Sequence, residues 1–178
     1  AQHAAVEATL GFAERHCAYT RRGHNGAERE KVTGLAVATF EHSVSREQDP
    51  QFHTHCLVAN VAQRVDGTYG SVDGRDLFRW KMALGAIYRA ELAAQLEARL
   101  PIQVIRDQQS FAIAGVPPTV QQHFSKRSEQ IKGWLDAHGY EGAVAAHAGT
   151  LDTRQTKGDI DRGALLARWK QEGVEIGW

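Results

Sequence analysis

Apolar and polar residues alternate with two different periods along the chain. In residues 4–19 the apolar side chains recur at helical spacing, which predicts an amphipathic helix. The runs 35–40 and 53–62 are short, apolar and β-like, and a polar loop at 43–52 separates them. Pro50 excludes a continuous helix through that loop. The pattern therefore predicts a helix followed by two paired strands.

The rest of the chain predicts further helices and hairpins. Asp73 and Asp161 are expected N-caps, and Gly139 is an expected C-terminal stop. This order favours an α+β fold, with an antiparallel β-sheet and helices packed on it, over a doubly wound parallel sheet. The expected elements are a strand at 68–72 after an Asp66-Gly67 turn, a helix at 75–100, strands at 102–106 and 110–113, and helices at 117–138, 143–151 and 162–171.

Size and charge narrow the class of protein. The 178 residues are typical of one compact domain, and no apolar run has the roughly 20 residues that span a bilayer. The formal net charge of zero argues against nucleic-acid binding driven by bulk charge, although a local basic groove stays open. Two cysteines without CxxC spacing indicate a reducing, cytoplasmic location. The first residue is not Met, so we expect a piece of a longer chain.

Three histidines have the spacing of a metal site. His53 and His55 are two residues apart, so on a strand both imidazoles point to the same face. His42 follows the preceding run and comes beside them if the two strands pair antiparallel. Three imidazoles suit Zn, Mn, Ni or similar divalent ions and leave coordination positions open. The chain has 9 histidines, so spacing alone leaves open that these three have no common ligand.

The segment from Phe40 to Asn60, FEHSVSREQDPQFHTHCLVAN, resembles the three-histidine signature of MobF-type conjugative relaxases, which are histidine–hydrophobe–histidine nickases. Ser43 departs from the pattern, where the family often has Asp. Further similar stretches are TRRGHNG, YRAEL, FSKRSEQI and LDTRQTK, so the resemblance extends over nearly the whole chain and implies a palm-like relaxase architecture. The signature is met by Phe40, His42, Ser45, Arg46, Asp49, Pro50, His53, His55 and Asn60.

The resemblance implies an activity. In the family, three histidines hold a divalent cation, such as Mg, Mn, Zn or Ni, at the scissile phosphate of single-stranded DNA from a plasmid transfer origin. A tyrosine then attacks the phosphate and leaves a 5′-phosphotyrosine link. By this resemblance His42, His53 and His55 are the metal ligands. Other proteins of the transfer complex are further implied partners.

The nucleophile is not found in this sequence. The four tyrosines, at positions 19, 69, 88 and 140, do not match the family's nucleophile motif. We therefore expect that residues 1–178 are the metal-binding, C-terminal part of a relaxase domain. The tyrosine-bearing segment would lie upstream, and this chain alone would not nick DNA.

Basic residues within the family-like stretches are candidate DNA contacts. Lys126, Arg127, Arg154 and Lys157 would bind phosphates, or would simply belong to solvated helix faces. Two other functions compete with the nickase: a module that binds single-stranded DNA without cutting it, and an unrelated three-histidine metallohydrolase. The length of the relaxase match and the lack of an HExxH motif argue against the hydrolase.

Overall fold

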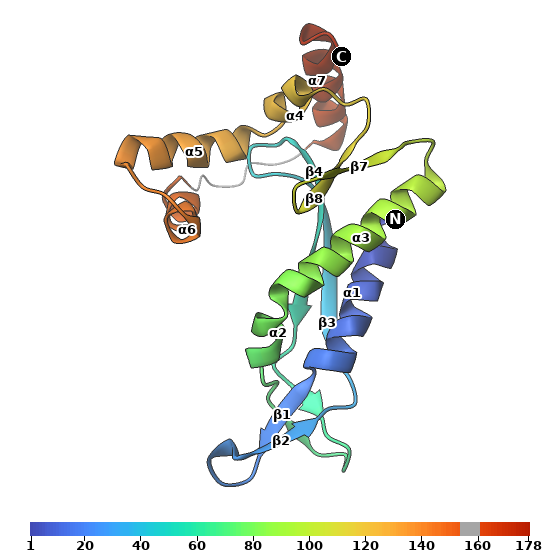
Figure 1. Ribbon diagram of the computed structural model, residues 1–178, viewed down its shortest axis with the longest axis vertical. Coiled ribbons are helices and arrows are strands. Elements are labelled where there is room, and N and C mark those ends of the chain that lie inside the picture. Colours follow the sequence, from blue (N-terminus) through green and yellow to red (C-terminus); the bar gives the residue numbers. More distant parts are fainter. Residues whose placement is uncertain (154–160) are drawn as a thin grey trace. The chain divides into compact units, whose positions relative to one another are not determined.

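The structure, a computed structural model, describes residues 1–153 and 161–178 (Figure 1). The chain forms two compact units. The first comprises Ala1–Glu41 and Thr54–Ala114, and the second comprises His42–His53 and Gly115–Trp178.

Two long helices form the body of the first unit. Helix α1 (Gln2–Cys17) packs along α3 (Lys81–Arg99), and α1 buries Ala5, Val6 and Ala13 (Figure 1). The predicted helix at 75–100 is interrupted at Trp80, so that a short α2 (Arg75–Arg79) precedes α3. The predicted cap at Asp73 is wrong by one residue, because Gly74 occupies the N-cap position of α2.

Short antiparallel strand pairs complete the first unit. The hairpins over residues 62–70 and 104–113 were predicted, but the predicted strands at 53–62 and 68–72 were too long, because residues 59–61 interrupt the first and only Tyr69–Gly70 remains of the second. The sequence did not predict the strand pair over residues 19–31, because the polar residues on both sides of its turn lack β alternation. The pairs are β1 (Tyr19–Arg22) with β2 (Glu28–Lys31) around the 3-10 turn η1 (His24–Gly26), β5 (Ala62–Gln63) with β6 (Tyr69–Gly70), and β7 (Val104–Asp107) with β8 (Ser110–Ile113).

The fourth strand pair carries the three histidines. Strands β3 (Val37–Val44) and β4 (Pro50–Val58) are hydrogen-bonded neighbours, and residues 45–49 join them. So short a connection requires an antiparallel pair. The predicted ten-residue loop at 43–52 was wrong, because β3 continues to Val44 and β4 already starts at Pro50.

In the part of it that the structure describes, the second unit contains four helices. The predicted helix at 117–138 is divided into α4 (Pro118–His123) and α5 (Lys126–His138), and it ends at Gly139 in the left-handed conformation, as predicted. Helix α6 (Ala143–Asp152) packs on α5. Helix α7 (Arg162–Glu175) begins at the predicted cap Asp161, whose carboxylate accepts bonds from the Gly163 and Ala164 amides. The α+β prediction is confirmed, with the described strands arranged as four two-stranded pairs.

Candidate metal centre

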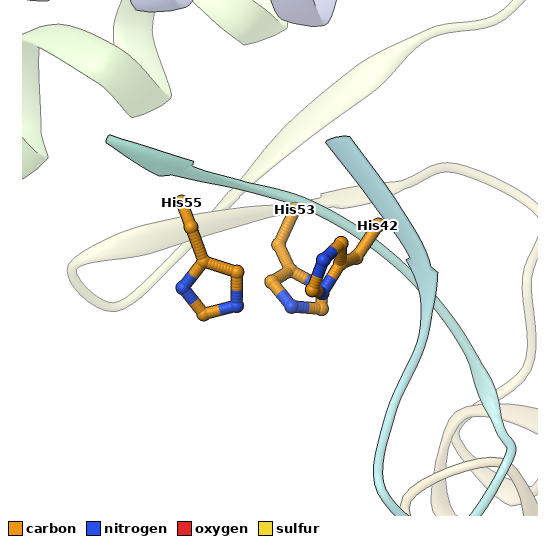
Figure 2. Close-up of side chains that lie close together, drawn as sticks. All are labelled: His42, His53 and His55. Carbon is orange, nitrogen blue, oxygen red and sulfur yellow. The ribbon is translucent and has the colours of Figure 1, made fainter. Parts of the chain in front are cut away.

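The three predicted ligands converge on one side of the β3–β4 pair. Figure 2 shows the imidazoles of His42, His53 and His55 projecting from neighbouring strands toward a common point. One ring nitrogen of each lies within 4.8 Å of those of the other two. The rings of His42 and His53 are 5.2 Å apart, centre to centre, and nearly perpendicular. His42 and His53 are partly buried, and His55 is exposed.

Strand periodicity explains this convergence. His53 and His55 are both inside β4, so the two-residue repeat places them on one face. His42 is within β3, not past its end as the sequence pattern indicated, and its strand lies beside β4. The predicted neighbourhood of the three histidines is therefore present, with a shorter turn than expected between the strands.

The backbone selects the protonation pattern of His53. Its Nδ1 atom lies 3.0 Å from the carbonyl oxygen of Gln51. A carbonyl oxygen can only accept a hydrogen bond, so Nδ1 carries the proton. In the neutral ring the lone pair is then on Nε2, which is the atom that would bind a metal.

The geometry fits a shared divalent ion. Imidazole nitrogens that bind one ion at about 2.0–2.1 Å lie at most about 4.2 Å apart. The 4.8 Å limit on the ligand atoms of His42, His53 and His55 is close to this spacing. Small side-chain rotations would bring all three to one ion. An all-imidazole set with three members suits a transition metal and leaves positions for a substrate oxygen.

Two of the four predicted DNA contacts lie in the described part of the chain, on the first turn of α5. The Lys126 side chain is 39% exposed, and its ammonium group lies 2.9 Å from Glu172 and 3.2 Å from Asp49. Arg127 is largely buried and donates bonds to the carbonyls of Thr150 and Thr153. Both residues thus have partners within the protein, and their contact with DNA stays a prediction. Arg154 and Lys157 lie outside the described residues.

The turn between the metal-site strands has partners that the sequence did not reveal. Arg168 and Trp169 of α7 both donate to the carbonyl oxygen of Gln48. The sequence pattern around these two residues predicted only a helix, since nothing in it links α7 to a turn 120 residues earlier. Asn60, shortly after the end of β4, accepts a bond from the Val72 amide through its side-chain oxygen.

The tyrosines have structural neighbours of their own. Tyr19 is in β1, with the Arg29 guanidinium 3.6 Å from its ring centre. Burial, and secondarily the nearby Cys56, raises the pKa of Tyr88 on α3. Tyr140 contacts the rings of Trp134 and His138. A raised pKa makes Tyr88 a poorer nucleophile, because less phenolate forms near neutral pH.

The family model of the TrwC relaxases matches residues 1–176. The chain belongs to the TrwC relaxase family. Solved structures agree: the conjugative relaxase TrwC in complex with oriT DNA, in a metal-free state, is 33% identical and superposes with a TM-score of 0.91 over 99% of this chain. A copper-bound complex of TrwC with oriT DNA is also 33% identical, with a TM-score of 0.90.

Relaxase relatives are longer than this chain. The multifunctional conjugation protein TraI of Escherichia coli is 32% identical over 173 residues, which cover 90% of this chain and 10% of TraI. This chain covers 64% of the chain in the metal-free TrwC structure and 61% of the chain in the copper-bound one. Among the residues described here, no helix has both the length and the apolar character to cross a membrane.

Proposed function

We propose that this chain is the metal-binding part of a conjugative relaxase, which nicks one DNA strand at a plasmid transfer origin by tyrosine transesterification. One observation carries the proposal: three histidines of a TrwC-family chain converge with their ligand atoms within 4.8 Å of one another. The family assignment argues against an unrelated metallohydrolase.

His42, His53 and His55 would hold the divalent cation. Once bound, such an ion stabilises negative charge on the phosphate oxygens during in-line displacement. The chain itself contributes the orientation of the ligands. The Gln51 carbonyl keeps the proton of His53 on Nδ1, and strand pairing keeps His42 beside that ring. Because the ligands are already aligned before the ion binds, less conformational entropy of their side chains is lost when the ion and the phosphate are held.

The proposed partner is single-stranded DNA from a transfer origin. Support comes from solved TrwC structures, which are complexes with oriT DNA. Lys126, Arg127, Arg154 and Lys157 are the proposed phosphate contacts, and none of the four tyrosines of this chain is the proposed nucleophile. We also place the protein in the cytoplasm, since both Cys17 and Cys56 are free thiols.

Metal content tests the site directly. The wild type and the variants His53→Ala and His147→Ala are loaded with Mn²⁺, dialysed and analysed by elemental mass spectrometry. His147 is an exposed residue of α6 and serves as the control. We expect about one ion per chain in the wild type and the control, and a large loss in His53→Ala, because two imidazoles hold the ion far less tightly than three. Equal metal content in all three proteins would refute the site.

A further inference from the structure

The turn that joins the two metal-site strands is enclosed by side chains from α5 and α7. We propose that Asp49 and Lys126, together with Glu172, are positioning residues that lock this turn and thereby align His42 and His53 for metal binding. This inference rests on the proposed metal site. It gives Lys126 a role distinct from contact with DNA.

The turn closes on itself by backbone bonds. The Ser45 amide donates to the Asp49 carbonyl at 2.9 Å, and the Gln48 amide donates to the Ser45 carbonyl at 3.1 Å. The Asp49 amide returns a bond to the Ser45 hydroxyl at 3.1 Å. Gln48 has φ of 61°, a left-handed conformation that is unfavourable for a residue with a side chain. Surrounding contacts must therefore hold the turn in this form.

Asp49 connects the turn to the start of α5. This residue is only 1% exposed. Its Oδ2 atom accepts a bond of 2.8 Å from the Lys126 amide, one of the N–H groups that the first turn of a helix leaves without an internal partner. Its Oδ1 atom lies 3.2 Å from the Lys126 ammonium. The same ammonium bonds Glu172 of α7 at 2.9 Å, so one lysine joins the turn to both helices.

Helix α7 holds the left-handed residue itself. The Gln48 carbonyl accepts bonds from Arg168 at 3.0 Å and from Trp169 at 2.8 Å. The Gln48 side-chain oxygen accepts a second bond from Arg168, also at 3.0 Å. Three donated bonds to one turn residue explain how its conformation is maintained.

Turn geometry controls the histidines because it sets the strand register. His42 lies three residues before Ser45, and His53 lies four residues after Asp49. A slip of one residue would turn one strand's side chains to the opposite face and separate the two rings. Removal of Lys126 would leave the buried Asp49 charge without its ion-pair partner, which favours opening of the turn.

Co²⁺ binding tests the alignment, with the absorption spectrum of the ion as a report on ligand geometry. The variant is Lys126→Met, and the matched control is Lys132→Met, an exposed lysine of the same helix. We expect the variant to bind Co²⁺ about 10- to 100-fold more weakly with an altered spectrum, the range seen when a group that orients a ligand is removed. The control should stay within about twofold of the wild type. Lys126→Arg should restore part of the affinity.

Other outcomes overturn the inference. A folded Lys126→Met protein with unchanged Co²⁺ affinity and spectrum would do so. So would intact Co²⁺ binding together with a smaller salt dependence of DNA binding, since that result assigns Lys126 to phosphate contact. If Lys126→Met does not fold, Glu172→Gln serves instead, because it weakens the bond to Lys126 and preserves side-chain volume. The Co²⁺ affinity of Glu172→Gln should then fall, and an unchanged affinity counts against the proposed role of Asp49, Lys126 and Glu172.

A metal-independent measurement separates this inference from the metal site. Amide hydrogen exchange of residues 42–53 in the metal-free protein should be faster in Lys126→Met than in the wild type or Lys132→Met. If the wild type binds no Co²⁺, the metal site fails, and the exchange data then decide whether the turn is locked. Equal exchange in all three proteins would show that Lys126 does not hold the turn.

Discussion

Replacement of Gly149 by alanine should destabilise the second unit, although alanine is the better helix former. Gly149 is buried in α6, and a Cβ atom there would lie 2.7 Å from Cε3 of Trp134 on α5. The indole cannot simply turn away, because its Nε1 atom donates a 2.7 Å hydrogen bond to Asp152. The new methyl group must therefore strain the packing of the two helices and break that bond.

The expected change in the free energy of unfolding is the sum of two costs and one gain. Overpacking costs about 1–3 kcal/mol, and the loss of the Trp134–Asp152 bond costs about 1 kcal/mol. The gain in helix propensity from glycine to alanine offsets about 1 kcal/mol of this cost. The net expected loss in the free energy of unfolding is therefore about 1–3 kcal/mol.

Gly133→Ala is the matched control. Gly133 is in the interior of α5, and a Cβ atom there would meet nothing within 4 Å. The same substitution should therefore stabilise the protein by up to about 1 kcal/mol. Urea unfolding, followed by tryptophan fluorescence and by far-ultraviolet circular dichroism, measures both variants. If the two substitutions shift stability in the same direction, the packing of Trp134 on Gly149 is not as described.

Three further predictions concern capping, charge and chemistry. Asp161→Ala should cost about 1 kcal/mol in urea unfolding, because it removes the cap that accepts bonds from Gly163 and Ala164 of α7; an unchanged midpoint would contradict this. The hydrogen bond from Lys126, with His123 and Arg168 nearby, lowers the pKa of Glu172. The ionised Glu172 therefore contributes stability above about pH 4.3, and this contribution is lost as the pH falls below that value. Glu172→Gln should make the free energy of unfolding less dependent on pH in this acid range, and an unaltered pH dependence would argue against the pairing. Finally, the 178-residue chain with Mn²⁺ and an origin-like oligonucleotide should give no protein–DNA adduct on a denaturing gel, and an adduct mapped to any of its four tyrosines would refute the assignment.

Local patterns were sufficient to predict the convergence of the histidines. The two-residue period fixed the shared face of His53 and His55, and the run before His42 indicated the partner strand. The glycine after α5 and the aspartate before α7 also indicated the correct helix ends. These signals involve only residues that are close together in the chain, so they can be recognised from the sequence alone.

Contacts between distant segments were not predictable in the same way. Arg168 and Trp169 meet Gln48 because of how α7 packs, and helical periodicity does not specify a partner so far away in sequence. The β1–β2 pair was missed because ion pairs and a tight turn support it in place of apolar alternation. The strand at 50–52 was missed because Pro50 was interpreted as part of a loop, although proline is tolerated at the first residue of a strand.

The turn at 45–49 bears on which changes of chain length the domain can accept. Surface turns are ordinarily where insertions, deletions and fused tags are tolerated. Here the backbone at Gln48 and the carboxylate of Asp49 are both occupied by side chains of other helices, so one added residue would displace bonds on every side. The turn around Gly67 is more open, since a Cβ atom at Gly67 would meet nothing within 4 Å and the ion pair of the adjacent Asp66 with Arg22 of β1 is exposed to solvent. A peptide tag or a fluorescent label therefore belongs beside Gly67, while the tip between the histidine strands must keep its five residues.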